Sequence, residues 1–296
     1  MENTIKLENV SKQYKQFSLN NISFPVKKGF VTGFIGPNGA GKTSTIKMIM
    51  NLIHMDTGRI ELFGLDHKEN ERAVKERIGF VYAENHFYDH LTIDKMKKII
   101  AAFYKDWDDA LFYETARQFD LPLKRKIKQL SSGMKMKFSL AIALAHHADL
   151  IIMDEPTSGL DPVFRSEILN VFSDIMQDEE KTIFFSTHIT SDLEQIADYI
   201  TFIDEGNILF HETKDDILER FAIVKGDTQL LDADTRKHLI GIRETDFGFE
   251  ALTANRAEIA KVFGQEVLVE PANLEQIMVF IVRGEQHNSI SRRETL

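Results

Sequence analysis

Residues 30–49, FVTGFIGPNGAGKTSTIKMI, constrain the fold more than any other part of the chain. An apolar run meets a glycine-rich loop that opens an amphipathic segment, so the order is strand, loop and helix. Residues 36–43 fit G-x-x-x-x-G-K-[ST], a pattern whose backbone N–H groups surround phosphate oxygens. The alternative is that an ordinary glycine-containing turn matches this pattern by chance. A chance match would not need a strand before it and a helix after it. The stretch therefore predicts a phosphate site formed by Gly36, Pro37, Asn38, Gly39, Ala40, Gly41, Lys42, Thr43 and Ser44.

Two chemical roles follow from the end of this pattern. Lys42 is expected to reach the β- and γ-phosphates of a nucleotide, where it can also assist phosphate transfer. The Thr43 hydroxyl is expected to ligate Mg²⁺. The sequence thus predicts a nucleoside triphosphate bound together with magnesium.

The rest of the chain predicts an α/β fold with further parts. Strands alternate with helices around the phosphate loop and again at 150–213, which predicts a mostly parallel sheet covered by helices. Residues 88–148 have helical spacing and little strand signal, so we expect an inserted α-helical subdomain within a first domain at 1–220. Short strands and two helices predict a small α+β domain at 221–284. The polar residues 285–296 predict a disordered tail.

Charge and composition exclude several classes of protein. The chain has 46 acidic and 36 basic residues, and the net charge of −10 argues against a nucleic-acid partner. It has no cysteine, which excludes disulfides and cysteine-based zinc sites. No apolar run approaches the ~18 residues that span a bilayer, and the first residues lack a signal-peptide pattern. We therefore expect the chain to reach a membrane only through a partner.

Two further sites are predicted at the ends of apolar strands. LIIMDEP, at 150–156, places Asp154 and Glu155 at the carboxyl end of a strand, where parallel sheets bind ligands. Asp154 would hold Mg²⁺, and Glu155 would polarise the attacking water as a general base. His188 ends TIFFSTH and could hydrogen-bond a γ-phosphate. Taken alone, the two acidic residues could simply be the point where a strand ends in a turn. The histidine could simply be hydrogen-bonded at the end of its strand.

The stretch LSSGM at 130–134 opens a long helical pattern and leaves two interpretations open. A serine at a helix start caps free N–H groups. A glycine-containing helix start also binds phosphate. We refer to residues 130–134 as the signature loop.

These motifs, in this order and together with SGLD at 158–161, resemble those of the ATP-binding-cassette ATPases over residues 3–220. The resemblance implies a P-loop core with an antiparallel β portion and the helical subdomain described above. It also implies that two nucleotide-binding domains dimerise head to tail around two ATP molecules. A GTPase is disfavoured, because the chain has no N-K-x-D guanine-reading motif.

The resemblance also assigns roles to single residues. Glu155 matches the catalytic glutamate and His188 the switch histidine, while Tyr14 lies where the family places an aromatic that stacks on adenine. The alternative for Tyr14 is an ordinary tyrosine at a strand edge. The next two roles concern the ATP of the opposite subunit: Ser131 and Gly133 would bind its γ-phosphate, and Asp161 would cross the dimer interface near the catalytic water.

Three positions depart from the family pattern. Ser132 and Met134 replace a glycine and a glutamine of the usual signature, and we expect function to be retained because Gly133 is kept. The glutamine that touches Mg²⁺ in the family falls on Ala83, with Glu84 one residue later. Glu84 could supply a metal ligand if the loop shifts by one residue, and otherwise water must replace the missing oxygen.

The segments after residue 221 and the variant signature resemble the bacterial exporters of antibiotics, lantibiotics and other amphipathic peptides. This resemblance implies an ATP hydrolase at the cytoplasmic face of the cell membrane, attached to a separate permease. NHFYDHL, at 85–91, could contact that permease or pack on its own subdomain. The segment after 221 could equally be a stability or dimerisation module. The alternative function is a soluble cassette ATPase that regulates or binds without a permease. Neither the transported substrate nor the identity of the second cassette follows from the sequence.

Overall fold

The computed structural model describes residues 2–82 and 87–293, with side chains up to residue 284. It contains two compact units, Met1–His211 and Glu212–Leu296. The sequence predicted the boundary after residue 220. Helix α8 (Lys214–Arg220) instead belongs to the second unit, where it continues directly into strand β11 (Ala222–Gly226).

Unit 1 contains two sheets. The first is antiparallel in the order β2-β1-β4-β5, with β1 (Asn3–Gln13), β2 (Ser18–Lys27), β4 (Thr57–Leu62) and β5 (Leu65–Asp66). The second has the order β10-β9-β3-β8-β7-β6, with β3 (Val31–Ile35), β6 (Ile78–Val81), β7 (Leu150–Asp154), β8 (Thr182–Thr187), β9 (Tyr199–Asp204) and β10 (Asn207–Thr213). Strands β3, β6, β7, β8 and β9 pair in parallel. This confirms the predicted α/β class.

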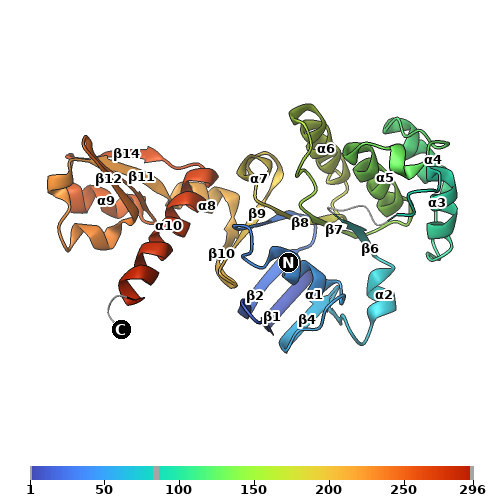
Figure 1. Cartoon of the computed structure of the whole chain (residues 1–296), viewed down its shortest axis with the longest axis horizontal. Helices are drawn as coiled ribbons and strands as arrows, with labels where there is room; N and C mark the ends of the chain where they lie inside the picture. The colour runs from blue at the N-terminus through green and yellow to red at the C-terminus, as the bar shows by residue number, and fades with distance from the viewer. Residues whose placement is uncertain (1, 83–86, 294–296) are drawn as a thin grey trace. The chain divides into compact units, whose positions relative to one another are not determined.

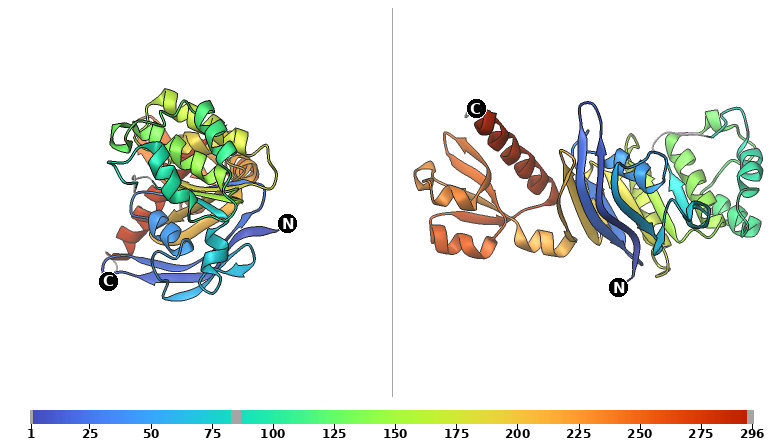
Figure 2. Two further views of the ribbon diagram at one scale, coloured as in Figure 1. Left: turned by 90° about the vertical axis from the view of Figure 1, so that its right-hand side faces the viewer. Right: turned by 90° about the horizontal axis from the view of Figure 1, so that it is seen from below.

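Helix α1 (Lys42–Ile49) packs on both sheets (Figures 1 and 2). Its buried Ile46 shares one hydrophobic core with Leu7 of the antiparallel sheet and Phe34 of the parallel sheet. The Phe34 ring lies 5.6 Å from that of Phe184, centroid to centroid, on the adjacent strand. Burial of this apolar surface holds the start of α1, and therefore the loop before it, at the carboxyl end of β3.

The predicted helical subdomain has its own core. Helices α3 (Ile93–Ala101), α4 (Asp109–Gln118) and α5 (Ser132–Ala145) gather at one end of unit 1 in Figure 1. Phe112 and Phe138 are fully buried there, and a short 3₁₀ turn (Ile127–Gln129) leads into the signature loop. Helices α2 (Glu71–Lys75), α6 (Pro162–Ile175) and α7 (Thr190–Ile196) complete unit 1.

Unit 2 is a four-stranded antiparallel sheet with helices. Its order is β12-β13-β11-β14, with β12 (Ile240–Thr245), β13 (Gly248–Thr253) and β14 (Leu268–Pro271). Helix α9 (Arg256–Phe263) shares a core with this sheet, and α10 (Leu274–Arg293) also packs on it. The sequence did not predict β13. Helix α10 also continues through residues 285–293, where a disordered tail was predicted. None of the helices within residues 2–82 and 87–293 has the length and apolar character to span a bilayer.

Candidate functional site

The loop at 36–43 lies close against neighbouring strands. A Cβ at Gly36 would come 2.1 Å from the carbonyl oxygen of Ile203 in β9, so a side chain there has no room. Gly41 has φ +113°, and a Cβ there would lie 2.5 Å from Cδ2 of Leu19 in β2. These glycines allow the backbone to bend tightly between β3 and α1 and to present N–H groups toward the cavity.

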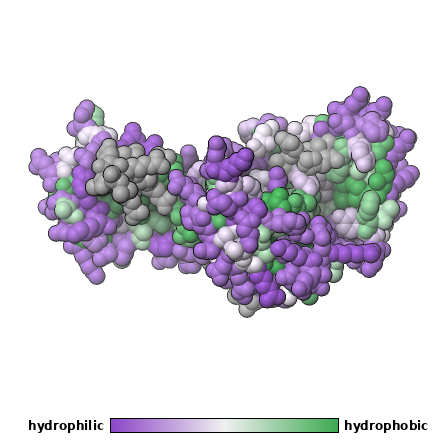
Figure 3. All heavy atoms as spheres, turned by 60° about the horizontal axis from the view of Figure 1, so that its bottom comes forward, coloured by the Kyte–Doolittle hydropathy of each residue, from purple (hydrophilic) through white to green (hydrophobic). Residues whose placement is uncertain are grey.

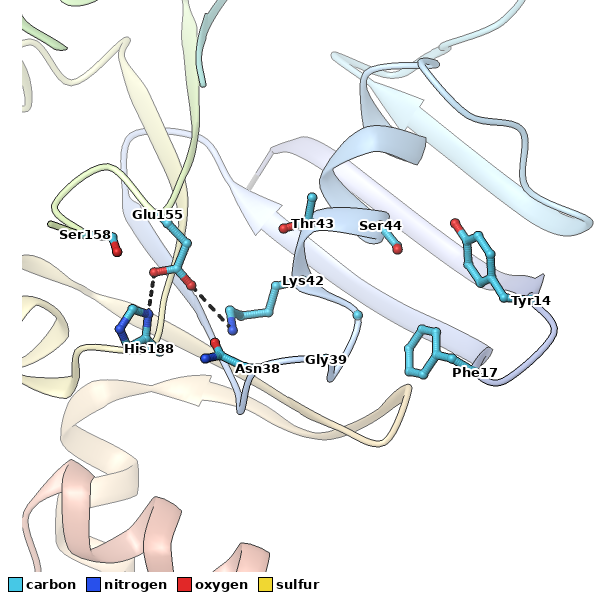
Figure 4. Close-up of a pocket in the computed structure, with 11 residues that line it drawn as sticks. Tyr14, Phe17, Asn38, Gly39, Lys42, Thr43, Ser44, Glu155, Ser158 and His188 are labelled. Carbon is cyan, nitrogen blue, oxygen red and sulfur yellow. Dashed lines mark hydrogen bonds and ion pairs between the residues drawn. The ribbon is translucent and has the colours of Figure 1, made fainter. Parts of the chain in front are cut away.

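A cavity of about 650 Å³ opens beside this loop (Figure 4). Most of its lining residues are ones that the sequence predicted to bind nucleotide or act in catalysis, and two are not: Phe17 and Ser158. The complete lining is Tyr14, Phe17, Asn38, Gly39, Gly41, Lys42, Thr43, Ser44, Glu155, Ser158 and His188.

A carboxylate connects the lysine and the histidine inside the cavity. Lys42 is only 6% exposed, and its Nζ donates to the carbonyl oxygens of Gly36 at 2.7 Å and Pro37 at 3.2 Å. The same Nζ lies 3.5 Å from Oε1 of Glu155, whose Oε2 accepts from Nδ1 of His188 at 2.7 Å. The three predicted catalytic residues therefore meet in one place, as Figure 4 shows.

Strand β8 positions the acidic pair at the end of β7. The backbone N–H of Glu155 donates to the Ser186 hydroxyl at 3.0 Å, and that hydroxyl donates to Oδ1 of Asp154 at 2.5 Å. Glu155 itself has φ +50°, a left-handed conformation that costs a non-glycine residue about 1–3 kcal/mol. The surrounding hydrogen bonds stabilise this turn and point the Glu155 side chain into the cavity.

The oxygen donors near the loop suit a magnesium ion. Thr43 lines the cavity, and Asp154 lies at the end of β7, which is separated from β3 by β8 alone. In the part of the chain that the structure describes, no group of three or more acidic or histidine side chains is placed to hold a metal. Mg²⁺ commonly takes one or two protein ligands together with substrate phosphates, and Thr43 and Asp154 are oxygen donors of that kind. Ala83 and Glu84 lie outside the described residues.

Two aromatic rings lie at the opposite end of the cavity from Glu155 (Figure 4). The rings of Tyr14 and Phe17 are 6.2 Å apart with an interplanar angle of 30°, and a turn joins the two residues, Tyr14 N–H donating to the Phe17 carbonyl at 2.8 Å. Sequence reasoning found Tyr14 and missed Phe17. The sequence signal that could have identified Phe17 was a second aromatic residue three positions after Tyr14, directly before β2.

The residues predicted to contact a second subunit's ATP lie apart from this cavity. The Ser131 hydroxyl caps α5 by accepting from the N–H of Met134 at 3.2 Å, while Gly133 is buried beside Phe164 of α6. Asp161 caps α6 by accepting from the N–H groups of Val163 and Phe164 at 3.0 and 3.1 Å. None of Ser131, Gly133 and Asp161 lines the cavity that holds Lys42.

A phosphate loop between a parallel strand and a helix, with an acidic pair on the same sheet, defines a P-loop nucleotide-binding protein. The sequence model of the family described as ABC transporter matches residues 19–158. The chain is 36% identical over 214 residues to the bacitracin transport ATP-binding protein BcrA of Bacillus licheniformis, covering 71% of this chain and 69% of that protein. The chain therefore belongs to the ATP-binding, ATP-hydrolysing proteins of ABC transporters.

Two other proteins extend this comparison. The lantibiotic transport ATP-binding protein SrtF of Streptococcus pyogenes is 33% identical over 222 residues, which cover 71% of this chain and 91% of that protein. A solved dimeric structure of the ATP-binding cassette MJ0796, bound to ADP and Pi, has a TM-score of 0.62 and 24% identity. It covers 71% of this chain and 98% of that one, and it establishes similarity of fold.

Proposed function

We propose that this protein powers an exporter, in which two cassettes dimerise head to tail around two Mg-ATP and drive a separate membrane permease. The observation that carries this proposal is the division of the site. Lys42, Glu155 and His188 meet in one cavity, whereas Ser131 and Gly133 do not line it. A second copy of the chain, or a related cassette, can supply the missing signature loop.

Five residues of the cavity have a specific role in this proposal. Lys42 binds the β- and γ-phosphates, and the Tyr14 and Phe17 rings stack on or beside adenine. Glu155 accepts a proton from the attacking water. His188 orients the Glu155 carboxylate and hydrogen-bonds the γ-phosphate.

Magnesium would be held by Thr43 and Asp154. Bound there, the ion would neutralise charge on the β- and γ-phosphates. Glu84 remains a proposed further ligand.

The signature loop fits a phosphate of the opposite subunit. Ser131 is exposed and stands at the first turn of α5, a helix of 14 residues whose N-terminus has a favourable potential for anions. The two interpretations of this loop are therefore compatible, since capping uses one N–H group and leaves others for phosphate. The solved MJ0796 cassette is dimeric, which supports the proposed dimerisation.

Antimicrobial or amphipathic peptides or drugs are the proposed cargo, supported by the relatives named for bacitracin and lantibiotic transport. The permease would hold the protein at the cytoplasmic face of the cell membrane. Tyr88 and Phe103, which are 58% and 75% exposed in the helical subdomain, are suitable contacts. Figure 3 shows apolar atoms at that end of the unit. Phe87 is not suitable, because its ring packs 4.8 Å from that of Phe138 in the subdomain core.

Glu155→Gln tests the proposed site. The amide cannot accept the proton of the attacking water, so this variant should bind ATP, lose turnover and accumulate as an ATP-bound dimer in light scattering. Ser131→Arg should leave ATP binding intact and abolish hydrolysis, because it disrupts only the site of the opposite subunit. Hydrolysis near the wild-type rate in Glu155→Gln would show that Glu155 is not the base, and hydrolysis in Ser131→Arg would exclude the composite site.

Co-purification from membranes separates the exporter from the alternative, a soluble cassette ATPase without a permease. The exporter requires an integral membrane protein to co-purify with the wild type. Alanine at both Tyr88 and Phe103 should reduce that association and leave basal ATP hydrolysis intact. Full recovery of the wild type free of any membrane protein would favour the alternative.

A further inference from the structure

A fully buried carboxylate lies outside the lining of the cavity, at the point where three functional segments meet. The side chain of Asp192, in the first turn of α7, is 0% exposed. Its Oδ2 accepts from the Thr157 hydroxyl, and its Oδ1 accepts from Nε of Arg165 at 2.5 Å. Arg165 also donates through Nη2 to the Ser191 hydroxyl. Both oxygens of the buried carboxylate are therefore hydrogen-bonded and its charge is paired.

Thr157, Asp192 and Arg165 belong to the three segments that carry the proposed catalytic and interface residues. Thr157 follows Glu155 by two residues, and Asp192 follows His188 by four. Arg165 stands one turn after Asp161 on α6. Asp192 therefore connects the turn after β7, the segment after β8 and the helix that begins at the predicted dimer interface.

Strands β7 and β8 pair up to Asp154 and Ser186, and beyond this pairing two side-chain hydrogen bonds join the segments that carry Glu155 and His188. One is the hydrogen bond between the two side chains inside the cavity, at 2.7 Å. The other is the bond from Thr157 to Asp192, two buried side chains that do not line the cavity. The strand pairing fixes the two segments only as far as Ser186, so the bond from Thr157 to Asp192 adds a contact on the far side of Glu155 and His188 in the sequence.

We propose that Asp192 is a positioning residue, which holds His188 and Glu155 in the geometry required for hydrolysis through Thr157 and Arg165. The inference rests on the proposed roles of Glu155 and His188. Asp192 does not line the nucleotide cavity, so it acts on turnover and not on ATP affinity. A displacement of reacting groups by about 1 Å can lower a rate about a hundredfold, which makes such a support consequential.

Asp192→Asn is the informative substitution because it is nearly isosteric. The amide oxygen can still accept from Arg165 and the amide N–H₂ can donate to the Thr157 hydroxyl, but the charge that pairs with Arg165 is lost. We expect kcat to fall by about ten- to a hundredfold while KM for ATP changes by less than about twofold. Thr157→Val should show the same division between kcat and KM, and Thr157→Ser, which keeps the hydroxyl, should retain most of the activity.

Asp109→Asn is the matched control. It also removes the charge of a carboxylate that pairs with a cation, here Lys97, whose Nζ lies 2.7 Å from Asp109. In this pair the cation is the buried partner, at 3% exposure, and Asp109 is 64% exposed. This pair lies in the helical subdomain, outside the cavity. All variants are measured well below their own melting temperatures, so that a lower kcat does not come from unfolded protein. We expect Asp109→Asn to melt earlier but to keep its kcat.

The inference is overturned if Asp192→Asn has a kcat within about twofold of the wild type, or if Asp109→Asn loses kcat equally. It is also overturned if Thr157→Ser is as impaired as Thr157→Val. Glu155→Gln, measured in parallel, keeps this failure separate from that of the proposed function. An inactive Glu155→Gln with a fully active Asp192→Asn rejects only the positioning role, whereas an active Glu155→Gln rejects the general base.

Discussion

Replacing Gly133 with alanine tests why the signature loop keeps a glycine at this position. A Cβ on Gly133 would lie 2.2 and 2.4 Å from Cδ1 and Cε1 of Phe164 in α6. Atoms cannot remain this close, so the ring must move or α5 and α6 must separate, and such overpacking costs about 1–3 kcal/mol. Alanine also gains about 1 kcal/mol over glycine within a helix. We therefore expect Gly133→Ala to lower the free energy of unfolding by up to about 2 kcal/mol.

Phe164→Ala removes the obstacle, so the effect of Gly133→Ala should change sign in that background. Thermal unfolding of the wild type, the two single variants and the double variant measures this. One kcal/mol corresponds to about 2–4 °C in a domain of this size, so the methyl group should raise the melting temperature by a few degrees once Phe164 is truncated. If Gly133→Ala shifts the melting temperature equally in both backgrounds, packing against Phe164 is not the reason for the glycine, and the reasoning is wrong.

Three further predictions concern other parts of the molecule. Lys42→Ala should weaken ATP binding about ten- to a hundredfold in titration calorimetry, because hydrogen bonds to a charged group contribute about 1.5–3 kcal/mol; an unchanged Kd would contradict this. Burial and the nearby charge of Lys27 lower the pKa of His211 to about 4 in the folded chain, whereas the unfolded chain has the ordinary histidine pKa of 6.5. Between these two values the unfolded chain binds a proton that the folded chain does not. The free energy of unfolding should therefore fall as the pH drops from 6.5 to 4, by an amount on the order of 1–2 kcal/mol after allowance for partial exposure. The fall should be less steep in His211→Phe, and parallel curves of stability against pH for the two proteins would refute this. Gly241→Ala should destabilise unit 2 by about 2–4 kcal/mol, since φ is +62° and a Cβ would lie 2.3 Å from the Phe280 carbonyl oxygen; an unchanged melting curve for that unit would count against it.

Elements with strong local chemistry were predictable from the sequence. The strand, glycine loop and helix around Lys42 follow from an apolar run, a motif and an amphipathic pattern, all within 20 residues. The helical subdomain was equally clear from its spacing. Strand β13 was missed because it begins at a glycine and contains a glutamate, so its pattern is weak. The helix at 285–293 was missed because polar composition alone predicts disorder and does not exclude continuation of α10.

The sequence by itself determined that the chain binds a phosphate, that Asp154 and Glu155 end a buried strand and that Ser131 begins a helix. These statements depend on residues that are neighbours in the chain. Only the tertiary structure decided that Glu155 lies between Lys42 and His188 and that the Asp192 carboxylate accepts a hydrogen bond from Thr157. The sheet order places β8 beside both β3 and β7, which brings together side chains from distant parts of the sequence. Hydrophobic periodicity indicates which residues form a strand but not which strands become neighbours, because that choice depends on the packing of the whole core.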